Sequence, residues 1–280
     1  MLKEIVSPLL SWYDENKRIL PWRDGQNAYY TWVSEIMLQQ TRVEAVKPYF
    51  ERFISELPDI SALAACPEEK LMKLWEGLGY YSRVRNMQEA AKTVEKEYNG
   101  KLPEDFEALL SLKGIGSYTA GAIASIAYGI PVPAVDGNVL RVISRITESR
   151  EDIGKAAVKR KTEKLLEEIM PEDRPGDFNQ ALMELGAVIC IPNGQAKCLV
   201  CPVSGKCLAN RNHTVEEIPV KAPKKPRVVE ERTVFVIQDG AATAILKRPD
   251  KGLLAGLYEL PNTLGYMEQE EAVSYVKNMG

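Results

Sequence analysis

The sequence predicts a mainly α-helical protein with a small α+β region at its C-terminal end. Apolar residues recur every three or four positions over most of residues 1–217, and the alternation typical of strands is scarce there. After residue 230 the pattern changes to short β-branched runs on either side of an Asp-Gly pair. With 280 residues, the chain has ample length for one large or two smaller domains.

Proline and glycine divide the helical part into segments. Pro21, Pro58, Gly100 and the glycines within 77–79 and 114–116 are typical helix breakers. Between them we expect helices at about 2–16, 29–40, 43–56, 68–74, 83–98, 105–111, 117–128, 138–147, 155–170 and 177–188. Residues 218–230, rich in proline and lysine, predict a linker.

The C-terminal segment 231–280 predicts the beginning of a second, α+β domain. Thr233–Gln238 and Ala241–Lys247 flank Asp239-Gly240, a pair that favours the tight turn of a β-hairpin. About fifty residues rarely fold alone without a stabilising cross-link. We therefore expect the chain to stop short of a complete domain.

The overall composition is that of an ordinary globular protein, with 45% hydrophobic and 27% charged residues. The 36 basic and 39 acidic residues give a net charge of −3, which argues against a protein that covers nucleic acid nonspecifically. No stretch approaches the ~18 apolar residues of a membrane span, and the charged N-terminus lacks a secretory signal, so we expect a cytosolic protein. His213 is the only histidine, so the sequence offers little support for chemistry that depends on a histidine base or a Ser-His-Asp triad.

Four of the five cysteines form one spacing pattern. Cys190, Cys198, Cys201 and Cys207 are spaced C-x7-C-x2-C-x5-C, which indicates a four-thiolate metal site in a reducing compartment. The residues alone leave structural zinc and an iron–sulfur cluster both open. Cys66 lies outside the pattern and is expected to be a buried free thiol.

Two further features suggest contact with a phosphate backbone and a rigid carboxylate. Gly114 and Gly116 lie between two expected helices, where a hairpin would turn its backbone N–H groups toward a phosphate; a simple turn is the alternative. Asp136 directly precedes the helix at 138–147 and is suited to cap it. A capping carboxylate is held rigidly and favoured in its ionised form by the helix dipole, so a chemical role is compatible with capping.

These features together resemble the endonuclease III superfamily of DNA glycosylases, and within it the MutY-type adenine DNA glycosylases. The similarity covers about residues 10–215. It is carried by several runs, which include Leu20-Pro-Trp-Arg, Trp32-Val-Ser-Glu-Ile-Met-Leu-Gln-Gln-Thr-Arg-Val, Gly77-Leu-Gly-Tyr-Tyr-Ser-Arg-Val-Arg-Asn and Phe178-Asn-Gln-Ala-Leu-Met-Glu-Leu-Gly. The part from Ser34 to Thr41 is the most specific. The resemblance implies a two-lobed helical core with a helix–hairpin–helix. One lobe would cover about 29–134, and the other 1–28 together with 135–217.

The resemblance also selects the metal. In this superfamily the four cysteines hold a [4Fe-4S] cluster, which favours iron over zinc for Cys190, Cys198, Cys201 and Cys207. One departure concerns the first spacing: the family usually has six residues between the first two cysteines, whereas this chain has seven, from Ile191 to Lys197. The loop that joins Cys190 to Cys198 is therefore one residue longer than the family pattern.

Two positions indicate the chemistry. Bifunctional members carry a lysine just after the hairpin, where its amine forms a Schiff base with the sugar; this chain has Tyr118 there, so we expect a monofunctional enzyme. Glu35 shares an apolar helical stripe with Trp32 and Ile36, which would raise the pKa of its carboxyl and keep it protonated near neutrality. The alternative is a surface glutamate paired with Arg42 or Lys47.

The expected reaction is release of adenine from a base flipped out of the duplex. Glu35 would protonate N7 of adenine, and ionised Asp136 would stabilise the oxocarbenium-like sugar. By resemblance, Asn138 orients this site and Tyr118 supports the chemistry at the sugar. The resemblance further assigns Trp22, Arg23 and Gln180 to the adenine pocket, and Gln40 and Tyr80 to insertion near the estranged base.

The tail and the partners complete the expectation. Thr233-Val-Phe-Val-Ile and Gly252-Leu-Leu-Ala-Gly-Leu-Tyr-Glu-Leu-Pro resemble the start of the MutT-like domain of the family, so 231–280 would be an incomplete copy. The expected partner is double-stranded DNA with adenine opposite 8-oxoguanine or guanine. We expect a monomer that associates with the nucleoid through DNA, not with membranes. The alternatives are a pyrimidine-mismatch or lesion glycosylase on the same scaffold, and a non-catalytic DNA-binding module with structural zinc.

Overall fold

The structure, a computed structural model, describes residues 2–192, 194–223, 226–249 and 251–278. The chain divides into two compact units, Met1–Ala222 and Pro223–Gly280. Asn193 of the cysteine loop and Lys224 and Lys225 of the predicted linker lie outside the described residues. Within the described part, every helix is too short or too polar to cross a lipid bilayer.

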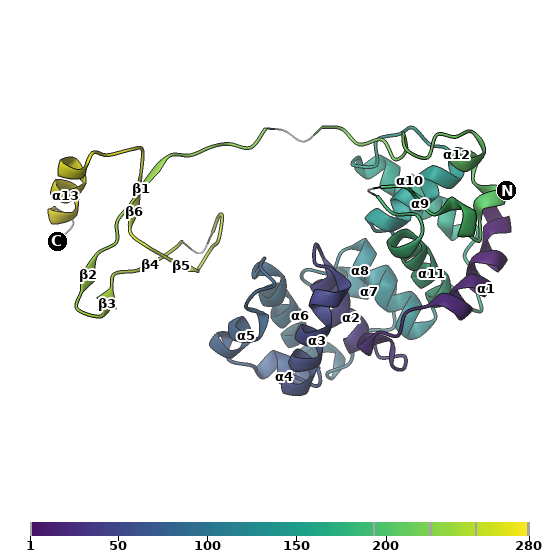
Figure 1. Cartoon of the computed structure of the whole chain (residues 1–280). Helices are drawn as coiled ribbons and strands as arrows, with labels where there is room; N and C mark the ends of the chain where they lie inside the picture. Colours follow the sequence, from purple (N-terminus) through teal and green to yellow (C-terminus); the bar gives the residue numbers. More distant parts are fainter. Residues whose placement is uncertain (1, 193, 224–225, 250, 279–280) are drawn as a thin grey trace. The chain divides into compact units, whose positions relative to one another are not determined.

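The first unit is helical throughout (Figure 1). Its α-helices are α1 (Val6–Asn16), α2 (Ala28–Leu38), α3 (Val43–Glu56), α4 (Ile60–Ala65), α5 (Glu68–Trp75), α6 (Ser82–Tyr98), α7 (Phe106–Ser111), α8 (Ser117–Ala122), α9 (Gly137–Thr147), α10 (Ala156–Glu167), α11 (Pro175–Val188) and α12 (Leu208–Arg211). Short 3₁₀ turns cover η1 (Leu2–Ile5), η2 (Pro21–Arg23), η4 (Cys198–Val200) and η5 (Ser204–Lys206), and α8 continues into a π-helical turn, η3 (Ile123–Ala127).

Side-chain caps fix where several of these helices begin. Asn27, Asp59, Asp105 and Asp136 each accept a hydrogen bond from the backbone N–H three residues further on. Each cap satisfies one of the N–H groups that the first helical turn leaves without a partner. The cap at Asp136 agrees with the sequence prediction and fixes that carboxylate at the first turn of α9.

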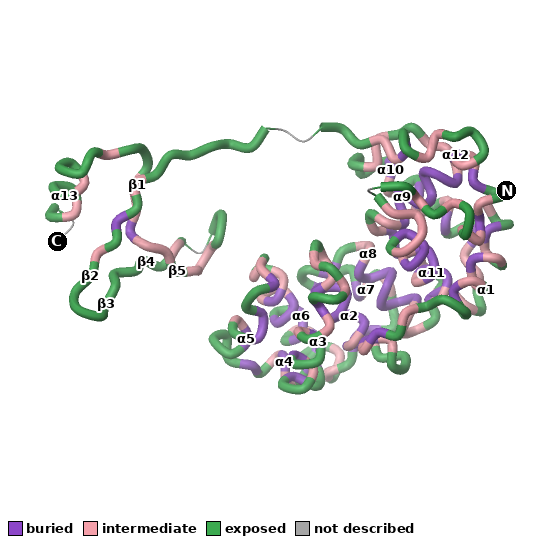
Figure 2. Tube along the Cα trace, viewed as in Figure 1, coloured by how far each residue is buried: buried purple, intermediate pink, exposed green. Residues whose placement is uncertain are grey.

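Two separate hydrophobic cores lie within the first unit (Figure 2). One core draws its buried residues from 20–124, and the other draws them from 5–13 and 135–218. The N-terminal helix α1 therefore packs with the second half of the chain, against α11. Leu20 and Trp22 were expected in the lobe formed by 1–28 and 135–217, but they pack in the core built from 20–124.

The expected helices agree with the structure except at a few places. The helix α4 has only six residues between Asp59 and Cys66, too few for a clear periodic pattern, and was missed. The helix α10 ends at Glu167, three residues before the expected end. The mainly α-helical class, with a small β region at the C-terminal end, is confirmed.

The second unit contains short antiparallel strand pairs and the helix α13 (Gln269–Lys277). The expected hairpin is present but short: β2 (Gln238–Asp239) pairs with β3 (Ala242–Thr243) around Gly240. The outer residues of the two predicted hairpin arms, Thr233–Gln238 and Ala241–Lys247, pair with strands outside this hairpin. Strand β1 (Arg232–Val234) pairs with β6 (Asn262–Leu264), and β4 (Leu246–Lys247) pairs with β5 (Tyr258–Glu259). The aromatic rings of Phe235 and Tyr275 stack at 5.3 Å.

Candidate active site

A large groove of the first unit lies where its two cores meet. It has a volume of about 1650 Å³ and is lined by α2, the coil that precedes and includes η2, α8, the start of α9, and α11. Among its lining residues are Glu35, Tyr118, Asp136 and Asn138. Four residues up to 103 positions apart in the sequence thus face one solvent-accessible space.

Glu35 lies on α2, and only 7% of its surface is exposed. Burial raises the pKa of its carboxyl to about 7 and the charge of Asp136 adds to this, while the Tyr118 hydrogen bond and the charge of Arg23 oppose it. The surface alternative is wrong, since Glu35 is buried and Lys47 pairs with Glu44 instead. A carboxyl with a pKa near 7 can donate a proton at neutral pH.

Tyr118 reaches Glu35 from α8. Its hydroxyl donates a hydrogen bond to Oε2 of Glu35 and lies 3.6 Å from Sδ of Met183. Burial, followed by the nearby charges of Glu35 and Asp136, raises the pKa of Tyr118 well above its usual value. The phenol is therefore a neutral donor that holds the Glu35 carboxyl in one orientation.

Two hydrogen bonds from its own helix fix the Asp136 carboxylate. Its Oδ1 accepts from the Val139 backbone N–H at 2.8 Å, and its Oδ2 accepts from Nδ2 of Asn138 at 2.7 Å. The pKa of Asp136 is raised overall, because burial outweighs these hydrogen bonds and the charge of Arg141, which lower it. The carboxylate is thus held in place by donors that favour its ionised form.

A buried arginine links this carboxylate to the cysteine loop. Nη2 of Arg141 donates to Oδ1 of Asn138 at 2.9 Å and to the carbonyl of Gly186 at 2.8 Å. Its Nε donates to the carbonyl of Cys190 at 2.8 Å. The sequence analysis missed Arg141, although an arginine inside the apolar run of α9 is a signal that could have found it.

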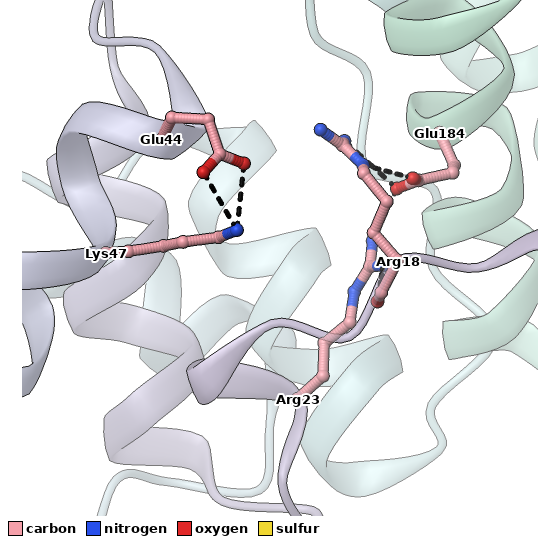
Figure 3. Close-up of polar contacts among 5 residues, drawn as sticks. All are labelled: Arg18, Arg23, Glu44, Lys47 and Glu184. Atoms are coloured by element: carbon pink, nitrogen blue, oxygen red, sulfur yellow. Dashed lines mark hydrogen bonds and ion pairs between the residues drawn. The ribbon is translucent and has the colours of Figure 1, made fainter.

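The buried carboxylate of Glu184 pairs with two arginines and thereby holds the coil that contains Arg23 (Figure 3). Glu184 of α11 is 1% exposed and accepts hydrogen bonds from Arg18 and, at 3.0 Å, from Nη2 of Arg23. Burial alone would raise the pKa of Glu184, but the two arginines outweigh it and the pKa lies below its usual value. The sequence did not point to this cluster, because its partners lie more than 160 residues apart.

The residues expected in an adenine pocket line the same groove. Trp22 is 7% exposed and packs edge-on against Phe50 with ring centroids 5.4 Å apart. Arg23 and Gln180 also line the groove, from η2 and α11. Their place is compatible with a base pocket, although Trp22 is also part of the hydrophobic core.

Gln40 and Tyr80 both have left-handed backbone conformations, with φ of 62° and 47°. Such φ values are uncommon for residues other than glycine, and they often mark functional turns. The Tyr80 ring is 64% exposed, which excludes simple packing in the core as its role. Gln40 is exposed too and lines the groove.

The hairpin between α7 and α8 requires its first glycine. Gly114 has φ of +82°, and a Cβ there would lie 2.8 Å from Cβ of Asn86. Gly116 forms the N-cap of α8, and no atom lies within 4 Å of where its Cβ would stand. The second glycine therefore leaves open space in front of the N-terminus of α8, as contact with a phosphate would need.

The four cysteines of the spacing pattern line one small pocket between α9, α11 and α12. Cys190 lines it with the others despite the longer first loop. Nη1 of Arg145 lies 3.2 Å from Sγ of Cys190 and donates to the carbonyl of Ile191 at 3.0 Å. Cys66 is a buried free thiol elsewhere, as expected.

The fold and the groove define a DNA glycosylase scaffold of the helix–hairpin–helix class. The family model of the HhH-GPD superfamily base excision DNA repair protein matches residues 33–168. A thermostable thymine-DNA glycosylase of known structure superposes with a TM-score of 0.68 at 28% identity, covering 75% of this chain and 96% of that one. A trapped endonuclease III–DNA intermediate, with a TM-score of 0.64 at 23% identity, shares the fold.

Curated relatives narrow this class to one family. An adenine DNA glycosylase of Buchnera aphidicola is 34% identical over 99% of this chain and 79% of its own length. Those of Arabidopsis thaliana and Homo sapiens are 40% and 37% identical over 96% and 91% of this chain. The chain spans 49% and 56% of these two longer relatives. The protein belongs to the adenine DNA glycosylase family.

Proposed function

We propose that the protein is a monofunctional DNA glycosylase that removes adenine mispaired with 8-oxoguanine or guanine in base excision repair. The observation that carries the proposal is the buried Glu35 carboxyl, with a pKa of about 7, in the same groove as Asp136. One carboxyl that can stay protonated and one held by donors form the acid and stabiliser pair of glycoside cleavage. Membership of the adenine DNA glycosylase family supports adenine as the base.

The reaction begins with double-stranded DNA whose adenine has left the stack and entered the groove. Glu35 transfers its proton to N7 of the base, so that adenine leaves as a neutral molecule when the N-glycosidic bond breaks. The bond electrons go to adenine, and the sugar acquires oxocarbenium character. Ionised Asp136, oriented by Asn138, stabilises that positive charge, and water adds to C1′ to give an abasic site.

Tyr118 is the residue that argues against strand cleavage through a Schiff base. It stands where bifunctional relatives carry a lysine, and a buried phenol with a raised pKa is no amine nucleophile. Its hydrogen bond orients the acid instead. The product is therefore an intact strand with an abasic site, not a cleaved strand.

The groove residues supply binding and orientation. Trp22, Arg23 and Gln180 would enclose the flipped base, while Gln40 and Tyr80 would enter the duplex near the estranged base. The hairpin at Gly114 and Gly116 would bind a backbone phosphate. These contacts would place the scissile bond between Glu35 and Asp136.

We infer that Cys190, Cys198, Cys201 and Cys207 hold a [4Fe-4S] cluster. All four line one pocket, and among the described residues no group of three or more Cys, His, Asp or Glu side chains has the geometry to hold a metal ion. The four-cysteine pattern that resembles that of the endonuclease III superfamily supports a four-iron cluster rather than a zinc ion. Bound there, the cluster would cross-link the end of α11 to the segment before α12 and thereby fix the partners of Arg141 and Arg145.

The decisive experiment is a single-turnover assay on duplexes with one adenine opposite 8-oxoguanine or guanine, run with and without alkali. Strand breaks that appear only after alkali support a monofunctional adenine glycosylase. Breaks without alkali contradict the role given to Tyr118. A thymine–guanine duplex tests the alternative suggested by the thymine-DNA glycosylase of similar structure. Thymine release without adenine release would contradict the assignment of adenine as the base removed.

A further inference from the structure

One arginine side chain joins the end of α2 to the turn before α6. Nη1 of Arg83 donates to the carbonyls of Ile36 and Gln39 at 2.7 and 2.8 Å. Its Nη2 donates to the carbonyls of Leu78 and Gly79 at 3.1 and 3.2 Å. A single planar guanidinium thus binds four carbonyls of two turns, which one lysine ammonium cannot reproduce.

Aromatic rings hold the same guanidinium in place. Its carbon lies 5.4 Å from the ring centroid of Trp75 and 5.7 Å from that of Tyr80. The Trp75 indole N–H donates to the Gly79 carbonyl at 3.0 Å, which Arg83 also binds. The turn that carries Tyr80 is therefore fixed both by hydrogen bonds and by cation–π contacts.

The two turns carry Gln40 and Tyr80, two of the exposed residues with left-handed backbones. Gln40 directly follows Gln39, and Tyr80 directly follows Gly79, so each comes one residue after a carbonyl that Arg83 binds. A residue other than glycine keeps such a φ only where its surroundings impose it. Arg83 is a group that both turns share, since it binds the carbonyl that precedes each of these residues.

We propose that Arg83 is a positioning residue that holds Gln40 and Tyr80 as one rigid unit, ready to enter the duplex beside a mispair. The inference rests on the proposed function, since it requires that these two residues insert into DNA. Insertion into stacked bases is effective only if the inserted groups do not have to be ordered on binding. Ile36 follows Glu35 on α2, so the same side chain also ties the inserted groups to the helix that carries the acid.

The test replaces Arg83 by lysine, which keeps the charge and loses the planar fork. Arg85→Lys is the matched control, because Arg85 lies on the same helix and pairs with Glu68 at 2.9 Å. Both changes are made in a Glu35→Gln background, so that adenine stays attached during binding. The measurements are the affinity ratio between mispaired and fully paired duplexes, and the fluorescence of 2-aminopurine placed beside the estranged base.

We expect Arg83→Lys to lower the affinity ratio by about tenfold, the size typical for losing charge-assisted contacts, and to suppress the fluorescence response. Arg85→Lys should change neither. Arg83→Gln, a shorter uncharged side chain, provides a second variant, and thermal unfolding identifies any variant that does not fold. Unchanged ratios in a folded Arg83 variant would overturn the inference.

A double-mutant cycle separates positioning from general destabilisation. If Arg83 acts through Tyr80, adding Arg83→Lys to Tyr80→Ala should reduce the affinity ratio little further. Additive losses would mean that the two residues act independently and would refute the inference. If the wild-type protein releases no adenine from the mispair, the proposed function itself is refuted, and the role of Arg83 falls with it.

Discussion

The hydroxyl of Tyr118 donates a hydrogen bond to Oε2 of Glu35, across 83 residues of sequence. This bond opposes the burial that raises the pKa of Glu35 to about 7. The acid is consequently held at a pKa near neutrality by two opposing effects, and each of them can be changed by a single substitution.

Replacing Glu35 by glutamine should abolish adenine release and leave DNA binding intact. Glutamine keeps the shape of the side chain but cannot donate a proton to N7, and general acid catalysis contributes roughly 10²- to 10⁴-fold. Single-turnover rates and equilibrium binding to the same mispaired duplex measure the two effects. Substantial excision by a folded Glu35→Gln variant would show that another group is the acid.

Tyr118→Phe should move the pH profile of excision to higher pH. The wild-type rate is expected to fall as pH rises through about 7, where Glu35 loses its proton. The phenol hydrogen bond lowers the pKa of Glu35, so its loss should raise that pKa and extend activity to higher pH. A profile of single-turnover rate against pH gives the midpoint directly. A midpoint that moves down or stays in place would contradict this account.

Glu35 should also make the folded protein less stable as pH rises. The ordinary pKa of a glutamate side chain is 4.5 and that of Glu35 in the folded protein is about 7, so the free energy of unfolding should fall between these two pH values and then level off. A shift of this size corresponds to about 3 kcal/mol. Denaturant unfolding of wild type and Glu35→Gln from pH 4 to 8 tests this. We expect the difference in stability to grow in favour of the variant.

The local environments of the proposed catalytic residues were easier to predict from the sequence than the residues that hold them. Glu35 and Asp136 carry local signals, an apolar helical stripe and a position before a helix, and both occupy the places expected. Glu184 and Arg83 carry no comparable signal. Each acts through partners on other elements, and such tertiary contacts leave no periodic pattern in a single sequence.

The same limit applies to the chain's smaller elements. The strand run Thr233–Gln238 predicted one long hairpin arm, but β1 takes part of it to pair with β6, some thirty residues away. The choice between these pairings depends on packing that short runs do not specify. The contacts of buried Asn179 likewise could not be predicted from the sequence. Its amide forms hydrogen bonds with Ser125, Val132 and Ala134.

The metal prediction can be tested by elemental analysis. The purified protein should be brown and contain about four iron atoms per chain and no stoichiometric zinc. Serine in place of Cys198, Cys201 or Cys207 should abolish the colour. Cys190→Ser tests the ligand whose spacing departs from the family, and it too should lose iron, since Cys190 lines the same pocket. A colourless protein with one zinc ion would favour the structural alternative.

Gly186→Ala should slow catalysis more than it weakens DNA binding. A Cβ at Gly186 would lie 2.6 Å from Cβ of Asn138, too close for the two helices to keep their present packing. Displacement of Asn138 would remove its hydrogen bonds to Asp136 and from Arg141, and thus the fixed orientation of the carboxylate. Misplacement by about 1 Å can cost on the order of a hundredfold in rate.

Gly205→Ala is the matched control for this change, because no atom lies within 4 Å of the position its Cβ would take. The rate of adenine release at saturating enzyme and the affinity for the mispaired duplex should be compared for both variants. We expect Gly186→Ala to lose rate while retaining most of its affinity, and Gly205→Ala to resemble wild type in both. Equal losses of rate in the two variants would mean that the contact between α11 and Asn138 does not govern the position of Asp136.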